Sequence, residues 1–473
     1  MKNQLSTPPA LLHAAALAAA LLALTGCADM SGIAPQARLR DAATLVDPGA
    51  PAAAVAPDWW RAFGDAQLDA LVQQALDGNP GLRQAAARIA RAEAFTRSAR
   101  AALGPQVNAG ADLTRQRYSE NGPYPPGQAG SILDIDTARL SGSWEIDFFG
   151  KNRAALESAL GTARAARADA DAARLLLAAN VVHAYLQLAR LQEQLQVADR
   201  TLAQRGEVLR LVRQRVSAGL DTRLELRQSE GALPEARQQI EALREQAALT
   251  RNALGALAGQ PKAALALTPP ALAAMQSAAI PAVLPADLLG RRPDVAAARW
   301  RVEASAQDVA VARAQFYPNV SLTAFVGLAS MGLGNFVEAG SREWGVGPAL
   351  RLPVFDAGRL RANLAGKSAD LDAAVESYNA ALLDAVRDAA DQLASSASVE
   401  RQIAEQRQAG EAAEAAYAIA RRRYEAGLGN YLQVLSAETQ VLAQRRLAVD
   451  LAARRLDAQA GVMRAVGGGY AAS

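Results

Sequence analysis

Two short stretches of the chain alternate strictly between apolar and polar positions. In residues 106–114 the odd positions are apolar or small, and in residues 137–148 the even positions are. Because successive side chains of a strand point to opposite faces, this period of two predicts strands with one apolar and one polar face. Comparable alternation recurs in residues 320–328 and 344–354. We therefore expect one β-hairpin in each half of the chain.

A helical period replaces the alternation after each hairpin. Apolar and medium-sized residues recur at alternating steps of four and three in residues 191–216 and again in residues 399–424. This heptad pattern predicts coiled-coil helices. A helix over residues 151–216 would be roughly 100 Å long. The returning helix, about residues 221–258, is shorter. A helix over residues 80–103 would stack end to end with it, so that the two together match the length of the long helix.

The chain consists of two copies of one unit, each with a helix, a hairpin, a long helix and a returning helix. One spacing relates the proline landmarks of the two copies, and a slightly shorter spacing relates the glycine landmarks. The matching pairs are Pro80 and Pro293, Pro105 and Pro318, Gly150 and Gly358, and Gly219 and Gly427. The position that matches Pro234 in the second copy is Leu442, which has no such constraint. The missing N–H of Pro234 predicts a kink or a fresh helix start within the first returning helix.

The N-terminus has the pattern of a secretory signal, with Lys2 before an apolar stretch that ends at Leu24. The following Thr25-Gly26-Cys27 completes a run that resembles the lipobox of bacterial lipoproteins. That resemblance implies cleavage before Cys27, a diacylglycerol on its sulfur and an N-acyl group. An ordinary signal peptide with an unmodified cysteine is the alternative. The Pro- and Ala-rich residues 28–57 are expected to form a flexible tether.

Composition excludes several classes of protein. Aromatic residues make up 5% of the 473 residues, and the apolar 51% is rich in alanine, which favours closely packed helices. The formal net charge of +3 gives no electrostatic argument for nucleic acid. Cys27 is the one cysteine, and the histidines are His13 and His183, which argues against disulfides and Cys/His metal sites. We expect no cofactor beyond the lipid on Cys27.

Enzymatic chemistry has little support in the sequence. His183 lies among apolar residues of a helix, which is typical of helix packing. Asp384, Asp388 and Asp391 share one helical face and could act as paired carboxylates, but a solvated or lumen-facing stripe explains them better. The glycines of residues 327–334 fall between strands and indicate a hairpin, not a phosphate loop. We expect a protein that is not an enzyme.

Four strands cannot close a membrane barrel, since single-chain barrels begin at about eight strands. A bilayer tolerates no open sheet edges, so several chains would share the barrel. A soluble β-sandwich is the alternative, but helices flank each hairpin and leave no second sheet. The expected water-facing row is polar and favours a wide barrel. It comprises Asn108, Asp112, Thr114, Thr137, Arg139, Ser141, Ser143, Glu145 and Asp147.

Several short motifs are spread over the chain: Trp59-Trp60-Arg61-Ala62-Phe63, Asn79-Pro80, Arg291-Arg292-Pro293-Asp294-Val295, Phe316-Tyr317-Pro318, Pro353-Val354-Phe355-Asp356-Ala357-Gly358 and Gly467-Gly468-Gly469-Tyr470. With these motifs the chain resembles the outer membrane factor family, the TolC-like channels, and within it the lipoprotein (NodT-type) branch that serves resistance-nodulation-division exporters. The resemblance implies a mainly α-helical fold with a transmembrane β part. Three chains would share a twelve-stranded barrel, continued by an α-helical periplasmic tunnel.

The resemblance also implies function and partners. The homotrimer would be a passive duct in the outer membrane, lipid-anchored and extending into the periplasm, that exports drugs or other small molecules. A periplasmic adaptor would open it, and an inner-membrane pump would supply it. A duct for type I protein secretion and a non-conducting envelope-spanning scaffold remain as alternatives.

Site residues follow from the same resemblance. Gly219 and Gly427 would form the periplasmic tips that contact the adaptor. The gate residues would be Leu432, Tyr424, Glu225, Gln433 and Ser436. Gln433 and Ser436 stand where the family has aspartates, so the acidic ring of the gate is absent. Without the family, the gate residues would be interpreted as ordinary coiled-coil seam and rim positions.

The expected organisation has six parts along the chain. They are a lipoprotein signal peptide (1–26), a lipid-anchored tether (27–58), a first repeat (59–258) with its hairpin at about 105–149, an inter-repeat equatorial segment (259–285), a second repeat (286–466) with its hairpin at about 318–357, and a C-terminal tail (467–473).

Overall fold

The structure is a computed structural model that describes residues 29–41, 55–262, 266–276 and 291–470. The chain divides into two compact units, here called the sheet unit and the helical unit. Among the described residues, the sheet unit comprises 29–39, 88–166 and 298–378, and the helical unit comprises 40–41, 55–87, 167–262, 266–276, 291–297 and 379–470. Cys27 and the signal segment lie outside the described residues, so the predictions made for them stay predictions.

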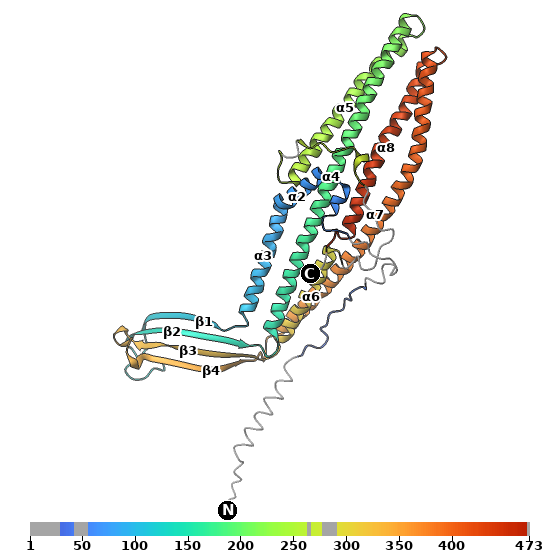
Figure 1. The fold of residues 1–473 in the computed structure, drawn as a ribbon. Coiled ribbons are helices and arrows are strands. Elements are labelled where there is room, and N and C mark those ends of the chain that lie inside the picture. Colours follow the sequence, from blue (N-terminus) through green and yellow to red (C-terminus); the bar gives the residue numbers. More distant parts are fainter. Residues whose placement is uncertain (1–28, 42–54, 263–265, 277–290, 471–473) are drawn as a thin grey trace, which may run out of the picture. The chain divides into compact units, whose positions relative to one another are not determined.

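The order of elements repeats in the two halves of the chain (Figure 1). The first half contains α2 (Ala66–Gly78), α3 (Pro80–Ala101), β1 (Gln106–Arg117), β2 (Ile132–Ile146), α4 (Lys151–Ser217) and α5 (Arg223–Leu257). The second half contains α6 (Pro293–Ala314), β3 (Asn319–Met331), β4 (Arg342–Arg351), α7 (Arg359–Glu425) and α8 (Tyr431–Ala465). This order confirms the predicted duplication, whereas the six domain boundaries stay predictions.

Prolines mark the starts of two matching helices. Pro80 and Pro293 are the first residues of α3 and α6, where a missing N–H costs nothing because the first N–H groups of a helix have no intrahelical partner. The helix α3 then ends before Gly104 and Pro105, as predicted.

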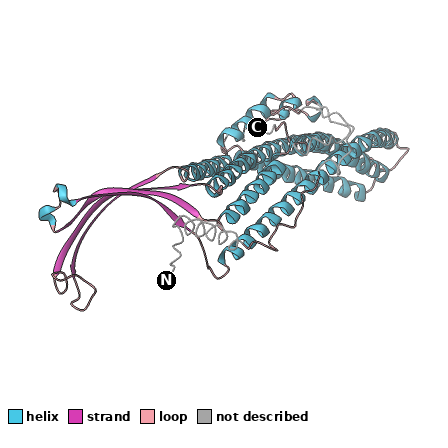
Figure 2. Cartoon of the chain, turned by 90° about the horizontal axis from the view of Figure 1, so that it is seen from below, coloured by secondary structure: helices cyan, strands magenta, loops and turns pink. Residues whose placement is uncertain are grey.

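The four strands form one antiparallel sheet in the order β1-β2-β3-β4, which is curved in Figure 2. The register carries the alternating apolar positions of the four strands onto one common face, whereas Phe325 lies on the other face. In one such row Ala109 lies opposite Leu140, Leu140 opposite Val326, and Val326 opposite Trp344. The predicted alternation is therefore confirmed, and the sheet has an apolar face and a polar face.

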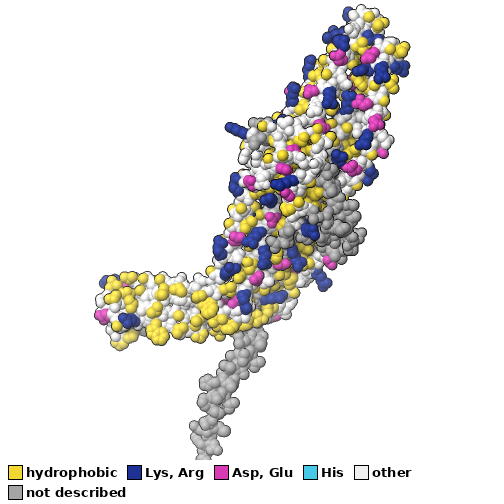
Figure 3. All heavy atoms as spheres, viewed as in Figure 1, with side chains coloured by type: hydrophobic (Ala, Val, Ile, Leu, Met, Phe, Trp, Pro, Cys, Tyr) yellow, Lys and Arg dark blue, Asp and Glu magenta, His cyan; other side chains and the backbone are white. Residues whose placement is uncertain are grey.

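The chain itself leaves the apolar face of the sheet uncovered. Val107 on β1 is 63% exposed and Trp344 on β4 is 76% exposed. In the view of Figure 3, charged side chains are sparse over the middle of the sheet and frequent on the helices. An exposed apolar face of this extent indicates contact with lipid or with further chains.

The helical unit has a core in which alanine, leucine and valine are frequent. Leu186, Leu188 and Val181 of α4 are almost completely buried. The tryptophan pair Trp59 and Trp60 packs into the same cluster as the apolar side of α2. The two long helices have 67 residues each, or about 100 Å at the rise of an α-helix. The predicted length of the long coiled-coil helices is therefore confirmed.

The heptad positions are buried or half-buried in both repeats. In α4, Leu191 and Leu209 are buried, and in α7 the corresponding seam positions Val399 and Tyr417 are buried as well. The apolar seam thus packs inward, as the spacing predicts.

The returning helix α5 meets α3 end to end. Asn79, which precedes α3, donates from Nδ2 to the carbonyl oxygen of Leu257 at 3.0 Å, and its Oδ1 accepts from the N–H of Gly81 at 2.7 Å. The last carbonyl of one helix and the first N–H groups of the next are thereby partly satisfied. The predicted end-to-end arrangement of these two helices is confirmed at this junction.

Pro234 does not start a new helix. The helix α5 runs as one element from Arg223 to Leu257 with Pro234 inside it. Of the two predicted alternatives, the fresh start is therefore excluded, and the kink stays a prediction.

The N-terminal segment is not a free tether over its described part. Asp372 of α7 accepts hydrogen bonds from the N–H groups of Gln36 and Ala37 at 2.7 and 2.8 Å. Arg361 donates to the carbonyl oxygen of Asp29 at 2.6 Å and forms an ion pair with its carboxylate. We call residues 29–41 the strap. The prediction of a flexible tether was wrong here because α7 supplies acceptors and donors for the strap backbone.

Candidate functional site

Each long helix ends in a glycine turn that reverses the chain. Gly219 follows α4 with a φ of 76°, and Gly427 follows α7 with a φ of 75°. In the second turn the N–H of Leu428 reaches back to the carbonyl oxygen of Arg423 at 2.7 Å. Positive φ favours glycine, since a Cβ is strained there. The backbone itself therefore requires glycine at both predicted tips.

Glu225 takes part in the cap of α5. Thr222 Oγ1 accepts from the N–H of Leu224 at 3.1 Å, and the N–H of Thr222 donates to Glu225 Oε2 at 2.9 Å. The hydrogen bond from the Thr222 side chain is the main reason that the pKa of Glu225 lies below its ordinary value. This reciprocal capping box fixes the start of α5 immediately after the turn.

Arg215, Asp221 and Tyr424 form a cluster that we call the tip clamp. Arg215 Nε lies 3.0 Å from Asp221 Oδ2, and Arg215 Nη1 donates to the carbonyl oxygen of Tyr424 at 3.1 Å. The guanidinium stands 4.6 Å from the centre of the Tyr424 ring, and the Tyr424 hydroxyl donates to the Asp221 carboxylate. The tip clamp thus joins the end of α7 to the turn between α4 and α5.

Tyr424 is completely buried in the clamp. Burial, followed by the bond to Asp221, raises the pKa of its phenol, so the hydroxyl stays protonated and acts as a donor. The structure does not bring Tyr424 and Glu225 together within the chain: the phenol bonds to Asp221, and Glu225 bonds to Thr222. Sequence reasoning missed Arg215 and Asp221, although a charged pair flanking the Gly219 turn was a visible signal.

The remaining predicted gate residues share one exposed side of α8. Leu432 is 63% exposed, and Gln433 and Ser436 are also exposed. Residues at these spacings lie on one helical face. The N–H of Gln433 is held by Asn430 Oδ1 at 3.0 Å, which caps α8. The gate role of these residues stays a prediction.

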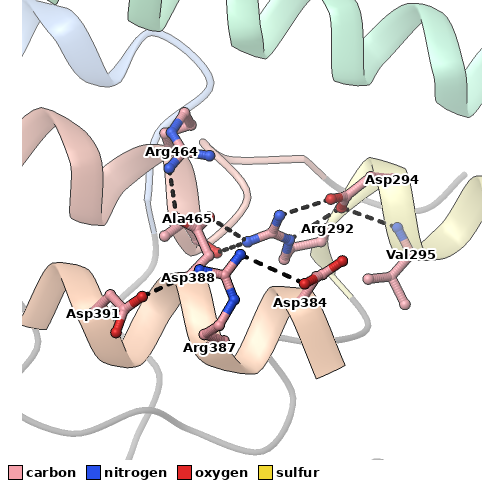
Figure 4. Close-up of polar contacts among 9 residues, drawn as sticks. All are labelled: Arg292, Asp294, Val295, Asp384, Arg387, Asp388, Asp391, Arg464 and Ala465. Atoms are coloured by element: carbon pink, nitrogen blue, oxygen red, sulfur yellow. Dashed lines mark hydrogen bonds and ion pairs between the residues drawn. The ribbon is translucent and has the colours of Figure 1, made fainter. Parts of the chain in front are cut away.

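A second polar cluster around Arg292 joins the start of α6, the end of α8 and the middle of α7 (Figure 4). Arg292 directly precedes α6 and contacts Asp294 at 2.7 Å and Asp388 of α7 at 3.1 Å. It also donates to the carbonyl oxygen of Ala465 at the end of α8, at 3.0 Å. Arg464 of α8 approaches the other oxygen of Asp388 at 2.7 Å. We call this set the Arg292 network.

Asp388 is shielded and doubly paired. Burial alone would raise the pKa of its carboxyl, but the hydrogen bonds from Arg464 and Arg292 outweigh burial and hold this pKa below its ordinary value. The predicted stripe of solvated or lumen-facing aspartates is therefore wrong for Asp388, whose side chain is 18% exposed. It fits Asp384 and Asp391, which are exposed and pair with Arg387.

His183 forms a surface pair rather than packing in the core. Its ring is 65% exposed, and Nδ1 lies 2.6 Å from Asp457 Oδ1 on α8. The hydrogen bond to Asp457 raises the pKa of His183. The apolar neighbours Val181 and Val182 are the residues of this segment that face the core. Within the described ranges, no group of three or more His, Cys, Asp or Glu side chains could hold a metal ion.

Comparisons with known proteins agree with this architecture. The model of the family described as outer membrane efflux protein matches residues 71–260 and 284–468. The fusaric acid resistance protein FusA of Burkholderia cepacia is 42% identical over 371 residues, 75% of this chain and 69% of that protein. The pyoverdine export outer membrane protein OpmQ of Pseudomonas aeruginosa is 35% identical over 87% of each chain.

Solved structures show the same fold. The outer membrane protein VceC of Vibrio cholerae is similar with a TM-score of 0.84 and 35% identity, covering 88% of this chain and 100% of that chain. The channel CusC is similar with a TM-score of 0.82 and 28% identity, covering 92% and 99%.

The chain therefore belongs to the outer membrane efflux protein family. It is the outer membrane channel component of a tripartite efflux system, and the members of this family are efflux channels rather than enzymes. By length and composition alone, the helix α4 could cross a membrane, and half of its apolar window is buried in the chain.

Proposed function

We propose that three copies of this chain form one duct with a shared twelve-stranded barrel. The uncovered apolar face of the sheet carries this proposal, together with the free edges of β1 and β4 at the ends of the strand order. Lipid can cover the apolar face, but it cannot satisfy the backbone of an open edge. Neighbouring chains would pair β4 with β1 and leave the polar face around water.

The duct is proposed to be passive, without catalysis and without a cofactor. Its cargo would be small organic compounds, including drugs, delivered by an inner-membrane pump. The names of two relatives support this class, since one gives resistance to fusaric acid and one exports pyoverdine.

The periplasmic tips are proposed to meet the adaptor at Gly219 and Gly427. Opening would move the exposed face that carries Leu432, Gln433 and Ser436 away from the same face of the neighbouring chains. The cap that holds Glu225 and the neighbouring tip clamp support this location, because they stiffen the turns against which an adaptor would press.

Cys27 is proposed to carry the diacylglycerol and the N-acyl group. The contacts of the strap with Arg361 support a membrane anchor here, since they hold Asp29 two residues beyond Cys27. A diacylated and N-acylated cysteine would hold the protein to a leaflet essentially permanently.

Purification in detergent followed by light scattering and planar-bilayer recording tests the duct. The proposal expects a particle of three chains that forms stable conducting pores. A monomer, or a trimer that never conducts, would overturn it, and the second outcome would support a non-conducting scaffold.

A further inference from the structure

Two of the largest side chains on the polar face of the sheet lie directly opposite glycines. Arg139 of β2 is paired with Gly327 of β3, and Phe325 of β3 is paired with Gly345 of β4. Gly327 is in turn opposite Glu343. Arg139, Gly327 and Glu343 therefore form one row across three strands.

Arg139 crosses Gly327 to reach Glu343. Its Nη2 donates to Glu343 Oε2 at 3.1 Å, and its Nε donates to Oε1 of the same carboxylate. A Cβ added at Gly327 would stand 2.8 Å from Arg139 Cγ and 2.4 Å from the carbonyl oxygen of Ala138. The absence of a side chain at Gly327 thus lets Arg139 lie along the sheet.

Phe325 lies in the same way over Gly345. A Cβ added at Gly345 would stand 2.6 Å from Cε1 of the Phe325 ring, and its three nearest neighbours are all atoms of that ring. The Arg139 guanidinium is 5.4 Å from the centre of the ring, within the range of a cation–π contact. Gly347 provides a contrast two residues further along β4, because a Cβ added there meets nothing within 4 Å.

We propose that Arg139, Phe325 and Glu343 form a fixed lining patch of the duct, held flat by Gly327 and Gly345, which sets the bore and the charge selectivity of the sheet region. The inference rests on the proposed function, because it turns the polar face of the sheet toward the water of the duct. The flat ring and guanidinium leave the passage open, and Glu343 neutralises Arg139.

Single-channel conductance tests the bore, recorded for all variants in the Leu432→Ala and Glu225→Ala background so that the expected tip constriction does not limit the current. In 1 M salt the Debye length is about 3 Å, so conductance reports width more than charge. Gly345→Ala pushes the Phe325 ring off the wall and lowers conductance. The double variant Gly345→Ala with Phe325→Ala restores it, since the new methyl group then has nothing to displace. Gly347→Ala, on the same strand and face, leaves conductance at the value of that background.

Equal conductance of Gly345→Ala and Gly347→Ala would overturn the proposal, as would a double variant that stays narrow. If Gly345→Ala does not assemble, the double variant decides: pores from it support the proposal, and no pores contradict it. A wild-type protein that never conducts contradicts the proposed function instead, so the two failures are distinguishable.

The reversal potential in a salt gradient near 0.1 M tests the charge, because the Debye length is then about 10 Å. Glu343→Gln leaves Arg139 unneutralised and shifts selectivity toward anions. Glu338→Gln makes the same change of charge outside the strands and serves as the control. Equal shifts in both variants would show that Glu343 has no special place in the lining.

Discussion

The buried guanidinium of Arg292 contacts residues of three helices, α6, α7 and α8. Its guanidinium is largely removed from water, which is costly unless its donors are used. Two carboxylates and the last helical carbonyl of α8 use them. The network therefore fixes where α6 begins relative to α7 and α8, and its role is structural.

Replacing Asp388 by Asn is expected to lower the free energy of unfolding by about 2 kcal/mol or more, because Arg292 and Arg464 lose their shared counter-charge. Asp384→Asn is the matched control, since that side chain is 75% exposed on the same helix. Denaturant unfolding followed by helical circular dichroism measures both. Equal stabilities would contradict the role of the network.

Asp388 also predicts a pH dependence. Its pKa is depressed in the folded protein, so its stabilisation is fully present above the unfolded value of about 3.9 and is lost as pH falls through the folded value. We expect the wild type to lose this stability below about pH 4. Unfolding curves of Asp388→Asn should show a smaller loss over that range.

Tyr424→Phe removes one donor from the tip clamp and leaves the ion pair of Arg215 with Asp221 in place. A hydrogen bond to a charged group is worth about 1.5–3 kcal/mol, so we expect faster amide hydrogen exchange in both tip turns with little change elsewhere. Glu207→Gln alters an exposed pair on α4, the helix that carries Arg215, and should leave exchange unchanged. Identical exchange in both variants would argue against a clamp.

At the scale of elements, contacts with α7 hold the strap in place. Arg361→Ala removes its contacts with Asp29 and Ser31, so residues 29–41 should be cleaved faster in limited proteolysis. Lys367→Ala is the control, because Lys367 lies on the same helix and pairs with Asp308 and Asp370. Unchanged cleavage of the Arg361 variant would show that the strap is held by other contacts.

The sequence predicted the regular elements closely because their signals are local. The long helix expected at residues 151–216 is Lys151–Ser217, and the returning helix expected at about 221–258 is Arg223–Leu257. The strap, the pairing of Tyr424 with Asp221 and the partners of Arg292 depend on residues far apart in the chain. A single sequence carries no period that reports such contacts.

At the scale of the whole molecule, the expected gate can be tested in the assembled channel. Leu432→Ala combined with Glu225→Ala should raise single-channel conductance or the entry of vancomycin into cells, since both changes shorten side chains at the expected constriction. Leu447→Ala, a partly exposed leucine further along α8, is the control. Unchanged conductance and permeability in the double variant would reject these residues as the gate.

Adaptor docking is tested at the same scale. Bulky residues at Gly219 and Gly427 should abolish export-dependent drug resistance while trimers still reach the outer membrane. Gly231→Ala, in the interior of α5 with open space around it, should preserve resistance. Normal resistance in the tip variants would contradict docking there, and loss of trimers would show a folding defect instead.

The tip clamp occurs once per chain, although the turn to which it belongs occurs twice. The second turn has Gly429 where the first has Asp221, and the first repeat has Val216 where the second has Tyr424. The second turn therefore cannot form a tip clamp of its own. In a ring of three chains, junctions held by a tip clamp inside each chain would alternate with junctions between neighbouring chains that lack it. The aperture would then widen along the contacts between subunits, with threefold rather than sixfold symmetry.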